Sequence, residues 1–231
     1  MVTIAEMVKA GMHFGHQARR WNPRMAPYIY GERNGVHIID LIQTSNYLED
    51  VCSFVTEQSA KGKTFLFVGT KNQAEELIYT YAVNSDSFYV NHRWLGGMLT
   101  NWRTIRTSIN NLKQLEDDKS SGRFERLPKK EAALKNKQHE RLEQYLGGMK
   151  NMKNIPDIVI IIGQPEELNA VYECKKLGLR TITILDTDCD PKLADLFIPA
   201  NDYSVSSLEL ILNQLCSAIN AGKQKTEPIQ G

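Results

Sequence analysis

Residues 157–162 have the sequence DIVIII, in which every position after the first is apolar and β-branched. Similar runs occur on either side of it in the chain, TFLFV at 64–68 and TITIL at 181–185. Runs that are apolar at successive positions are typical of strands buried on both faces, as in a parallel sheet. The shorter runs VHII at 36–39 and FI at 197–198 have the same composition. We expect all five runs to be strands of one sheet.

Helical patterns lie between these runs, at roughly 43–60, 72–84, 166–177 and 204–220. The last pattern carries an apolar stripe at i, i+3, i+4, i+7 and i+11, counted from Leu208. Alternation of strands and helices over this length predicts an α/β fold with a parallel sheet and helices on both faces.

Residues 102–150 interrupt the alternation. Apolar side chains recur every three or four residues from Trp102 to about Lys119, which predicts one amphipathic helix. Pro128 suits the first turn of a second helix, which runs to about Tyr145. The short turn between the two predicts an antiparallel helical hairpin inserted into the α/β domain. That domain would comprise residues 1–101 and 151–221, including a basic N-terminal extension at 1–35, and residues 222–231 would be a flexible tail.

The formal net charge of +1 conceals a strong segregation of charge along the chain. Residues 1–100 have 9 basic and 9 acidic side chains, 101–154 have 13 and 7, and 155–231 have 6 and 11. The three parts therefore carry 9 − 9 = 0, 13 − 7 = +6 and 6 − 11 = −5. A cationic arm beside an acidic body favours a polyanionic partner, although solvated helices are also rich in charge.

Basic and aromatic side chains occur side by side, and each of the three tryptophans has an arginine next to it in the sequence. Arginines can bind phosphates in pairs of hydrogen bonds, and aromatic rings can stack on bases. The alternative is a core tryptophan with an arginine stacked over it. Together with the basic arm, the pattern predicts RNA binding by Arg19, Arg20, Trp21, Asn22, Arg24, Arg33, Arg93, Trp94, Trp102, Arg103, Arg106, Lys113, Lys129, Lys130, Lys135 and Lys137.

The acidic turn after the 181–185 run, DTDCD at 186–190, is the main candidate for other chemistry. As a competing hypothesis, Asp186 and Asp188 could serve a Mg²⁺-dependent phosphotransferase. His16 could join them in a metal site, but no further ligand is evident, and carboxylates after a strand commonly cap helices or form turns. We therefore predict no catalytic residue, no metal and no cofactor.

Other function classes are excluded by composition. The four cysteines are scattered without CxxC or zinc-finger spacing, which argues against a disulfide scaffold or a structural zinc site. No apolar run approaches the roughly 18–20 residues of a membrane span. The N-terminus shows neither a signal-peptide nor a transit-peptide pattern. We expect neither a membrane nor a small-molecule substrate among the partners.

Several long strings resemble one family nearly end to end, over about residues 5–221. They are GMHFGHQ at 11–17, RWNP at 20–23, MAPYI at 25–29, RNGVHIIDL at 33–41, FVGTK at 67–71, NHRWLGGMLTNW at 91–102, PD at 156–157 and IPAND at 198–202. On these strings the chain resembles the family of the second protein of the small ribosomal subunit, in its bacterial and plastid form.

The resemblance implies a flavodoxin-like or Rossmann-like α/β domain with an inserted helical hairpin, and no enzymatic activity. It also implies a structural role between the head and body of the small ribosomal subunit, in contact with small-subunit rRNA. Neighbouring ribosomal proteins would be partners, among them the mRNA-binding first protein of the subunit, whose docking late in assembly this family supports. Details such as LADLF at 193–197 resemble cyanobacterial and plastid members. We therefore expect a chloroplast ribosome, with the bacterial cytoplasm as the alternative.

Overall fold

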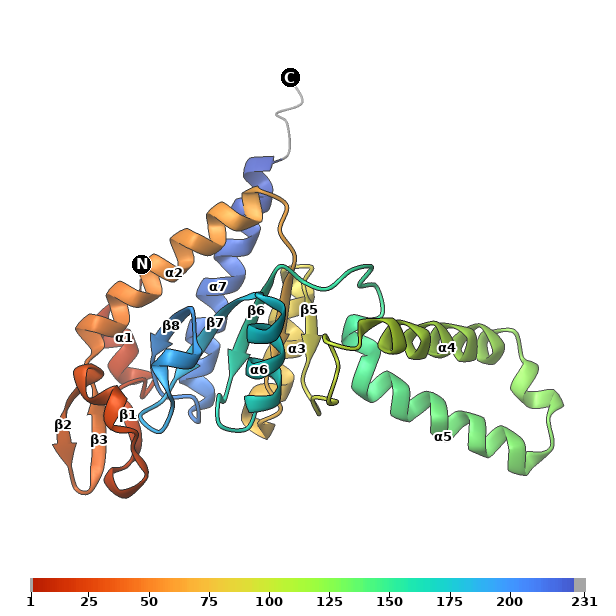
Figure 1. Ribbon diagram of the computed structural model, residues 1–231, viewed down its shortest axis with the longest axis horizontal. Helices are drawn as coiled ribbons and strands as arrows, with labels where there is room; N and C mark the ends of the chain where they lie inside the picture. The colour runs from red at the N-terminus through yellow and green to blue at the C-terminus, as the bar shows by residue number, and fades with distance from the viewer. Residues whose placement is uncertain (1, 227–231) are drawn as a thin grey trace.

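A five-stranded parallel sheet forms the centre of the molecule in the computed structural model, which describes residues 2–226 (Figure 1). Its strands are β4 (Phe65–Val68), β5 (Phe88–Val90), β6 (Ile158–Ile162), β7 (Arg180–Leu185) and β8 (Leu196–Pro199). They lie in the order β5-β4-β6-β7-β8. Numbered along the chain, that order is 2-1-3-4-5, the flavodoxin-like arrangement. The predicted α/β class is confirmed.

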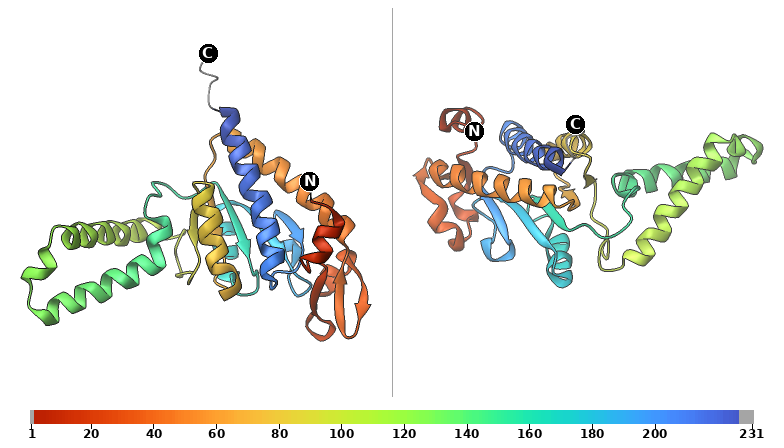
Figure 2. Two further views of the ribbon diagram at one scale, coloured as in Figure 1. Left: turned by 180° about the vertical axis from the view of Figure 1, so that it is seen from behind. Right: turned by 90° about the horizontal axis from the view of Figure 1, so that it is seen from above.

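Helices cover both faces of this sheet, as predicted. On one face lie α1 (Ile4–Lys9), α2 (Leu41–Ala60), α3 (Asn72–Asn84) and α7 (Val205–Thr226). The other face carries α6 (Leu168–Leu177) and the root of the hairpin, as the view from above shows (Figure 2). Alternate strand residues supply the two cores: Ile158, Ile160 and Ile162 face α7, whereas Val159 and Ile161 face α6.

The prediction for residues 36–39 is wrong in one respect. They form β3 (Val36–Ile39), which lies in a separate three-stranded antiparallel sheet between β1 (Phe14–Gln17) and β2 (Ile29–Arg33). Its residues are alternately half-buried and buried, as expected for a strand covered on one face only. Asn34 and Gly35 both have positive φ, 54° and 77°, and connect β2 to β3 as a two-residue hairpin turn.

Most helix boundaries match the prediction within two residues, and α3 matches it at both ends. The exception is the C-terminus, where α7 continues to Thr226 instead of ending near residue 220. Gly222 is buried, and a Cβ there would lie 2.4 Å from the backbone oxygen of Thr56 in α2. The predicted flexible tail is therefore wrong for 222–226, and residues 227–231 lie outside the described part of the chain.

The predicted hairpin is present and projects from the body as a long arm (Figures 1 and 2). It consists of α4 (Trp102–Ser120), the short 3₁₀ helix η3 (Arg123–Arg126) and α5 (Lys129–Leu146), followed by η4 (Gly147–Met149). Its root is not independent of the body, because Ile109 and Leu112 of α4 share a core with Val159 and Ile161 of β6. The proposed division into domains stays a prediction.

Three further 3₁₀ segments complete the described structure: η1 (Ala18–Arg20), η2 (Pro23–Tyr28) and η5 (Pro191–Leu193). None of the helices within residues 2–226 combines the length and apolar character that a membrane crossing requires.

Candidate nucleic-acid interface

Residues 17–28, which contain η1 and η2, form an irregular basic strip that is attached to the body by hydrogen bonds and an ion pair. Asn22 begins η2, since its side-chain oxygen accepts a hydrogen bond from Arg24 N at 3.0 Å. Its own backbone N–H donates to Thr187 O at 2.8 Å, which fixes the strip to the turn after β7. Arg19 and Arg20 are exposed on η1. The guanidinium of Arg24 pairs with Asp190, so part of its charge is already neutralised.

The tryptophans differ from one another in a way that the sequence did not reveal. The Trp21 side chain is 37% exposed and packs against the ring of His37 at 5.1 Å between centroids. Trp102, the first residue of α4, is half-buried. Trp94 is only 7% exposed. A ring so deeply buried is not available to stack on a base, which favours the alternative of a core tryptophan that supports the fold.

Glu173 of α6 explains the position of Trp94. Its Oε1 accepts hydrogen bonds from Trp94 Nε1 at 3.0 Å and Gly97 N at 2.7 Å. Its Oε2 accepts from Leu99 N and from the N–H and hydroxyl of Thr100, each at 3.0 Å. Although partial burial opposes it, this set of donors holds the pKa of Glu173 below its usual value. One carboxylate thus organises the loop that leads into the hairpin, leaving Arg93 exposed beside it.

The first helix of the hairpin separates its apolar and cationic side chains. Ile109 and Leu112 face the protein, whereas Arg103, Arg106 and Lys113 are exposed. At 100° per residue these three cations fall within about 80° of one another on the side away from the core. The helix therefore presents one cationic face to solvent.

The second helix, α5, also has a cationic face, but one of the predicted lysines lies outside it. Lys130 and Lys137 are seven residues apart and lie on one exposed face. Arg141, which is not among the predicted residues, lies on the same face. Lys135 instead is half-buried on the inner side, with its ammonium 5.9 Å from the centroid of the Phe124 ring. Helical spacing could have identified Arg141 and separated Lys135 from the others.

Most of the side chains predicted to bind RNA are exposed in the structure. The exposed ones are Arg19, Arg20, Trp21, Arg24, Arg33, Arg93, Arg103, Arg106, Lys113, Lys129, Lys130 and Lys137. Asn22, Trp102 and Lys135 are half-buried, and Trp94 is buried. The strip and the hairpin lie at opposite ends of the molecule rather than side by side (Figure 1).

The acidic turn after β7 forms a second cluster, at the carboxyl ends of the parallel strands. Nδ1 of His16 lies 2.8 Å from Oδ2 of Asp186, and Nε2 lies 3.6 Å from Oδ2 of Asp188. A hydrogen bond from His16 N to Thr187 Oγ1, 2.9 Å long, brings β1 to this turn. Gly15 permits the approach, because a Cβ there would lie 2.5 Å from a Thr187 methyl. The hydrogen bond to Asp186 raises the pKa of His16.

Two further residues belong to this cluster that the sequence pattern did not connect with the acidic turn, Asp202 after β8 and Lys71 after β4. Asp202 is fully buried, and its Oδ2 lies 2.8 Å from Nζ of Lys71. Burial raises the pKa of Asp202 to about 7; Lys71 opposes that rise, and Asp186 adds to it. Burial alone would lower the pKa of Lys71, but Asp202 outweighs it and the pKa is raised. Their proximity could have been predicted, because both residues follow predicted strands and the carboxyl ends of parallel strands meet at one edge of a sheet.

The cluster is suited to cations more than to catalysis. His16, Asp186 and Asp202 place three possible ligand atoms within 4.8 Å of one another, and Glu116, His139 and Glu143 do the same on the hairpin. Asp202, rather than Asp188, therefore completes the group with His16 and Asp186. Asp186 is buried and already in contact with His16 and Thr187 N, so it is not available as a nucleophile.

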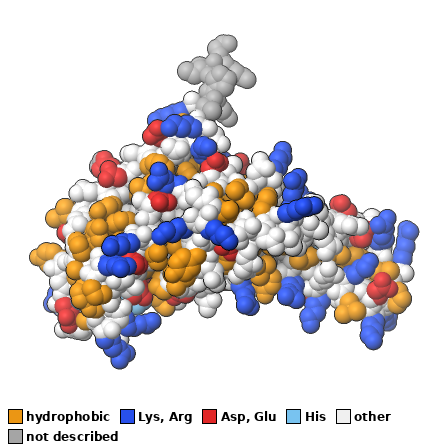
Figure 3. Space-filling model, in the orientation of Figure 1, with side chains coloured by type: hydrophobic (Ala, Val, Ile, Leu, Met, Phe, Trp, Pro, Cys, Tyr) orange, Lys and Arg blue, Asp and Glu red, His pale blue; other side chains and the backbone are white. Residues whose placement is uncertain are grey.

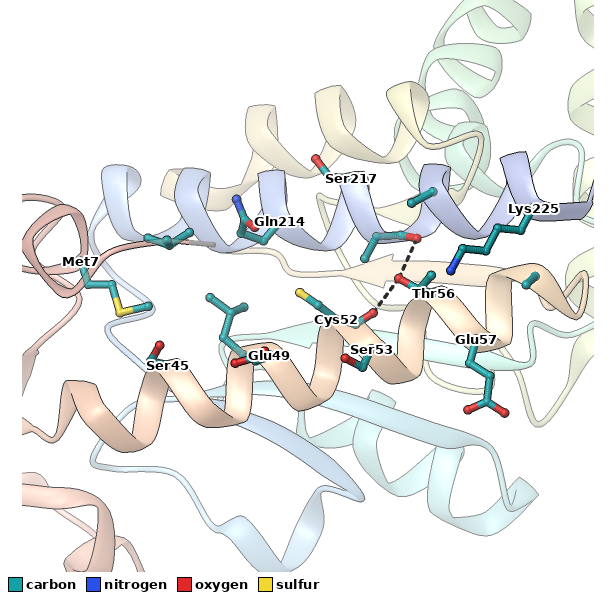
Figure 4. Close-up of a pocket in the computed structure, with 15 residues that line it drawn as sticks. Met7, Ser45, Glu49, Cys52, Ser53, Thr56, Glu57, Gln214, Ser217 and Lys225 are labelled. Atoms are coloured by element: carbon teal, nitrogen blue, oxygen red, sulfur yellow. Dashed lines mark hydrogen bonds between the residues drawn. The ribbon is translucent and has the colours of Figure 1, made fainter.

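A groove of about 750 Å³ lies between α2 and α7 (Figure 4). Small side chains such as Ser53 and Ser217 line much of it, and its charged side chains are Glu49, Glu57 and Lys225. With two acids and one base it does not suit a polyanion.

Comparison with known proteins agrees with the resemblance noted in the sequence. The family model described as ribosomal protein S2 matches residues 7–222. The small ribosomal subunit protein uS2c of Oltmannsiellopsis viridis is 61% identical over 96% of this chain and 94% of its own length. That of Porphyra purpurea is 53% identical, covering 96% and 92%. The small ribosomal subunit protein uS2 of a Picosynechococcus strain is 54% identical, covering 96% and 87%.

Proposed function

Because this chain belongs to the ribosomal protein S2 family, we propose that it is a structural constituent of the small ribosomal subunit that binds small-subunit rRNA. It has no enzymatic role, as is general for this family of structural proteins. Its relatives belong to the bacterial and plastid type, and its expected location is the plastid ribosome.

The observation that carries the rRNA contact is the hairpin. It projects from the body (Figure 1) and presents cationic faces on both α4 and α5, while most of its apolar side chains face inward. A projecting, cationic arm suits the phosphate backbone of a large folded RNA, because neutralised phosphates release counterions and so favour binding. The N-terminal strip supplies a second contact at the far end of the molecule.

Finer parts of the proposal follow from the family resemblance. The protein would lie between the head and body of the subunit and would support late assembly. It would also help to dock the mRNA-binding first protein of the subunit. The exposed aromatic side chains of the N-terminal sheet, among them Tyr30 at 82% exposure, offer a surface for protein contacts there.

The competing phosphotransferase hypothesis has no support. Its supposed nucleophile, Asp186, is buried, and Asp188 lies beside the imidazole of His16. Membership of a family of structural proteins argues against it as well.

The test uses charge substitutions in the intact chain, since removing the hairpin would expose Val159 and Ile161, which share a core with its root. The variant R103Q/R106Q/K113Q removes three charges from one exposed face of α4. We expect it to shift from the small-subunit fraction toward free protein in sucrose gradients. Affinity for small-subunit rRNA transcribed in vitro should depend less steeply on salt, by about 2 to 3 in the log–log slope.

The matched control is K9Q/K61Q/K225Q, which removes three exposed charges from α1, from the residue after α2 and from α7. It should keep the sedimentation and salt dependence of the wild type. If the hairpin variant and the control both behave like the wild type, the hairpin does not bind rRNA. If the wild-type chain itself never sediments with small subunits, the whole proposal is refuted.

A further inference from the structure

The acidic last third of the chain contains an unexpected cluster of cations. Of its six basic residues, three line one cavity of about 380 Å³: Lys175, Arg180 and Lys192. This basic pocket lies at the amino ends of β7 and β8, the opposite edge of the sheet from the His16–Asp186 cluster. Sequence alone does not reveal it, because its members are up to 17 residues apart in an acidic segment.

Three different elements supply the three cations. Lys175 lies in the last turn of α6, Arg180 is the first residue of β7, and Lys192 belongs to η5. All three are exposed. Between the first two, Gly178 ends α6 with a φ of 66°, and a Cβ there would meet no atom within 4 Å. The mouth of the pocket is therefore open to a ligand from solvent.

The protein neutralises these cations only in part. Asp195 is the one acid among the residues lining the pocket, which gives 3 − 1 = +2. Its Oδ2 accepts hydrogen bonds from the N–H and hydroxyl of Thr181 at 2.8 and 3.2 Å. Its Oδ1 lies 4.0 Å from Nη1 of Arg180, at the limit of an ion pair. Interaction with the helix dipole accounts for a lysine at the end of α6 but not for Arg180 or Lys192.

The chemistry of the pocket selects phosphate. One arginine can bind two phosphate oxygens at once, and lysines add point charges. Among the described residues none of the lining side chains is aromatic, so nothing in the pocket can stack on a base. Contacts of this kind position a nucleic acid by its backbone rather than by its sequence.

The place of the pocket in the fold supports the same partner. The strip and the hairpin occupy opposite ends of the molecule, and α6, β7 and β8 lie between them (Figure 1). Lys and Arg side chains form a row across this face of the body (Figure 3). An RNA that contacts both ends would find cations along the path between them.

We propose that the basic pocket formed by Lys175, Arg180 and Lys192 is a third rRNA contact, which binds backbone phosphates between the strip and the hairpin. The inference rests on the proposed function and adds to it a site on the acidic part of the chain.

The experiment measures binding of the full chain to small-subunit rRNA, transcribed in vitro, over a series of salt concentrations. In K175Q/R180Q/K192Q the log–log salt slope should become less steep by about 2 to 3, with affinity at low salt reduced about tenfold or more. The control K9Q/K61Q/K225Q also loses three positive charges, but elsewhere on the body, and should keep the wild-type slope. Both variants alter exposed side chains only, and thermal unfolding checks that they fold.

Three outcomes would overturn the inference. The pocket variant could match the wild type in slope and affinity while R103Q/R106Q/K113Q is impaired, which would leave the proposed function standing. The control could lose as much affinity for rRNA as the pocket variant does, which would show that only the total charge of the protein matters. Finally, the pocket variant could bind rRNA normally yet fail to enter subunits, which would assign the pocket to an acidic segment of a neighbouring protein.

Discussion

Replacing Glu173 by alanine should destabilise the protein far more than a half-exposed glutamate ordinarily would. The carboxylate accepts five hydrogen bonds, and three of their donors, on Trp94, Gly97 and Leu99, are partly buried. A buried donor that loses its partner costs about 1–3 kcal/mol. We take about 1 kcal/mol for each of these three donors and assume that water replaces the carboxylate at Thr100. The free energy of unfolding should then fall by about 3 kcal/mol.

The assay is urea unfolding followed by tryptophan fluorescence, because Trp94 itself reports on the loop. For a chain of this size, about 3 kcal/mol corresponds to a fall in melting temperature of roughly 6–12 °C. E173Q keeps the shape and one acceptor oxygen, so its loss should be intermediate. E76A, an exposed glutamate on α3, is the control and should change stability by no more than about 0.5 kcal/mol. A loss below about 1 kcal/mol in E173A would refute the view that Glu173 organises the root of the hairpin.

Three further predictions concern other parts of the molecule. G148A should cost about 2–3 kcal/mol in urea unfolding, because the new Cβ would lie 2.2 Å from the backbone oxygen of Tyr89; wild-type stability would show that η4 has room to move. Stability should fall as pH rises from about 4 to about 7, by up to about 1.4 kcal/mol per pH unit. Over that range folded Asp202, with its pKa raised to about 7, keeps a proton that the unfolded chain has released. In D202N, measured with chelator present, the free energy of unfolding should depend less on pH over this range. An unchanged pH dependence would mean that another group causes it. R24Q should alter the free energy of unfolding by no more than about 1 kcal/mol, since its pair with Asp190 is at the surface, yet weaken rRNA binding in filter assays; equal binding would remove Arg24 from the interface.

Some features of this protein could be predicted from the sequence because they depend on local patterns. Strands buried on both faces are apolar or β-branched at nearly every position, which made β4, β6 and β7 recognisable. The hairpin was recognisable from helical spacing and from a turn too short for other connections. The cationic faces of α4 and α5 follow from the same spacing, so most of the exposed candidate residues were predictable.

Strand β3 and the tryptophans required the tertiary structure. A four-residue apolar run does not reveal whether one or both of its faces will be covered. The Asn34-Gly35 pair before it is typical of a two-residue hairpin turn, but the prediction for β3 did not use that signal. Burial of Trp94 depends on Glu173, 79 residues away in the sequence. An arginine beside a tryptophan is therefore compatible with either a base contact or a core position.

Strand order decided the remaining features. It places Asp202 beside Lys71 and Asp186, and it gathers Lys175, Arg180 and Lys192 at the other edge of the same sheet. Charge counted along the chain described this segment as acidic, yet it contains a basic pocket. The physical reason is that periodicity is set by each element alone, whereas a site depends on which elements the packing of the core brings together.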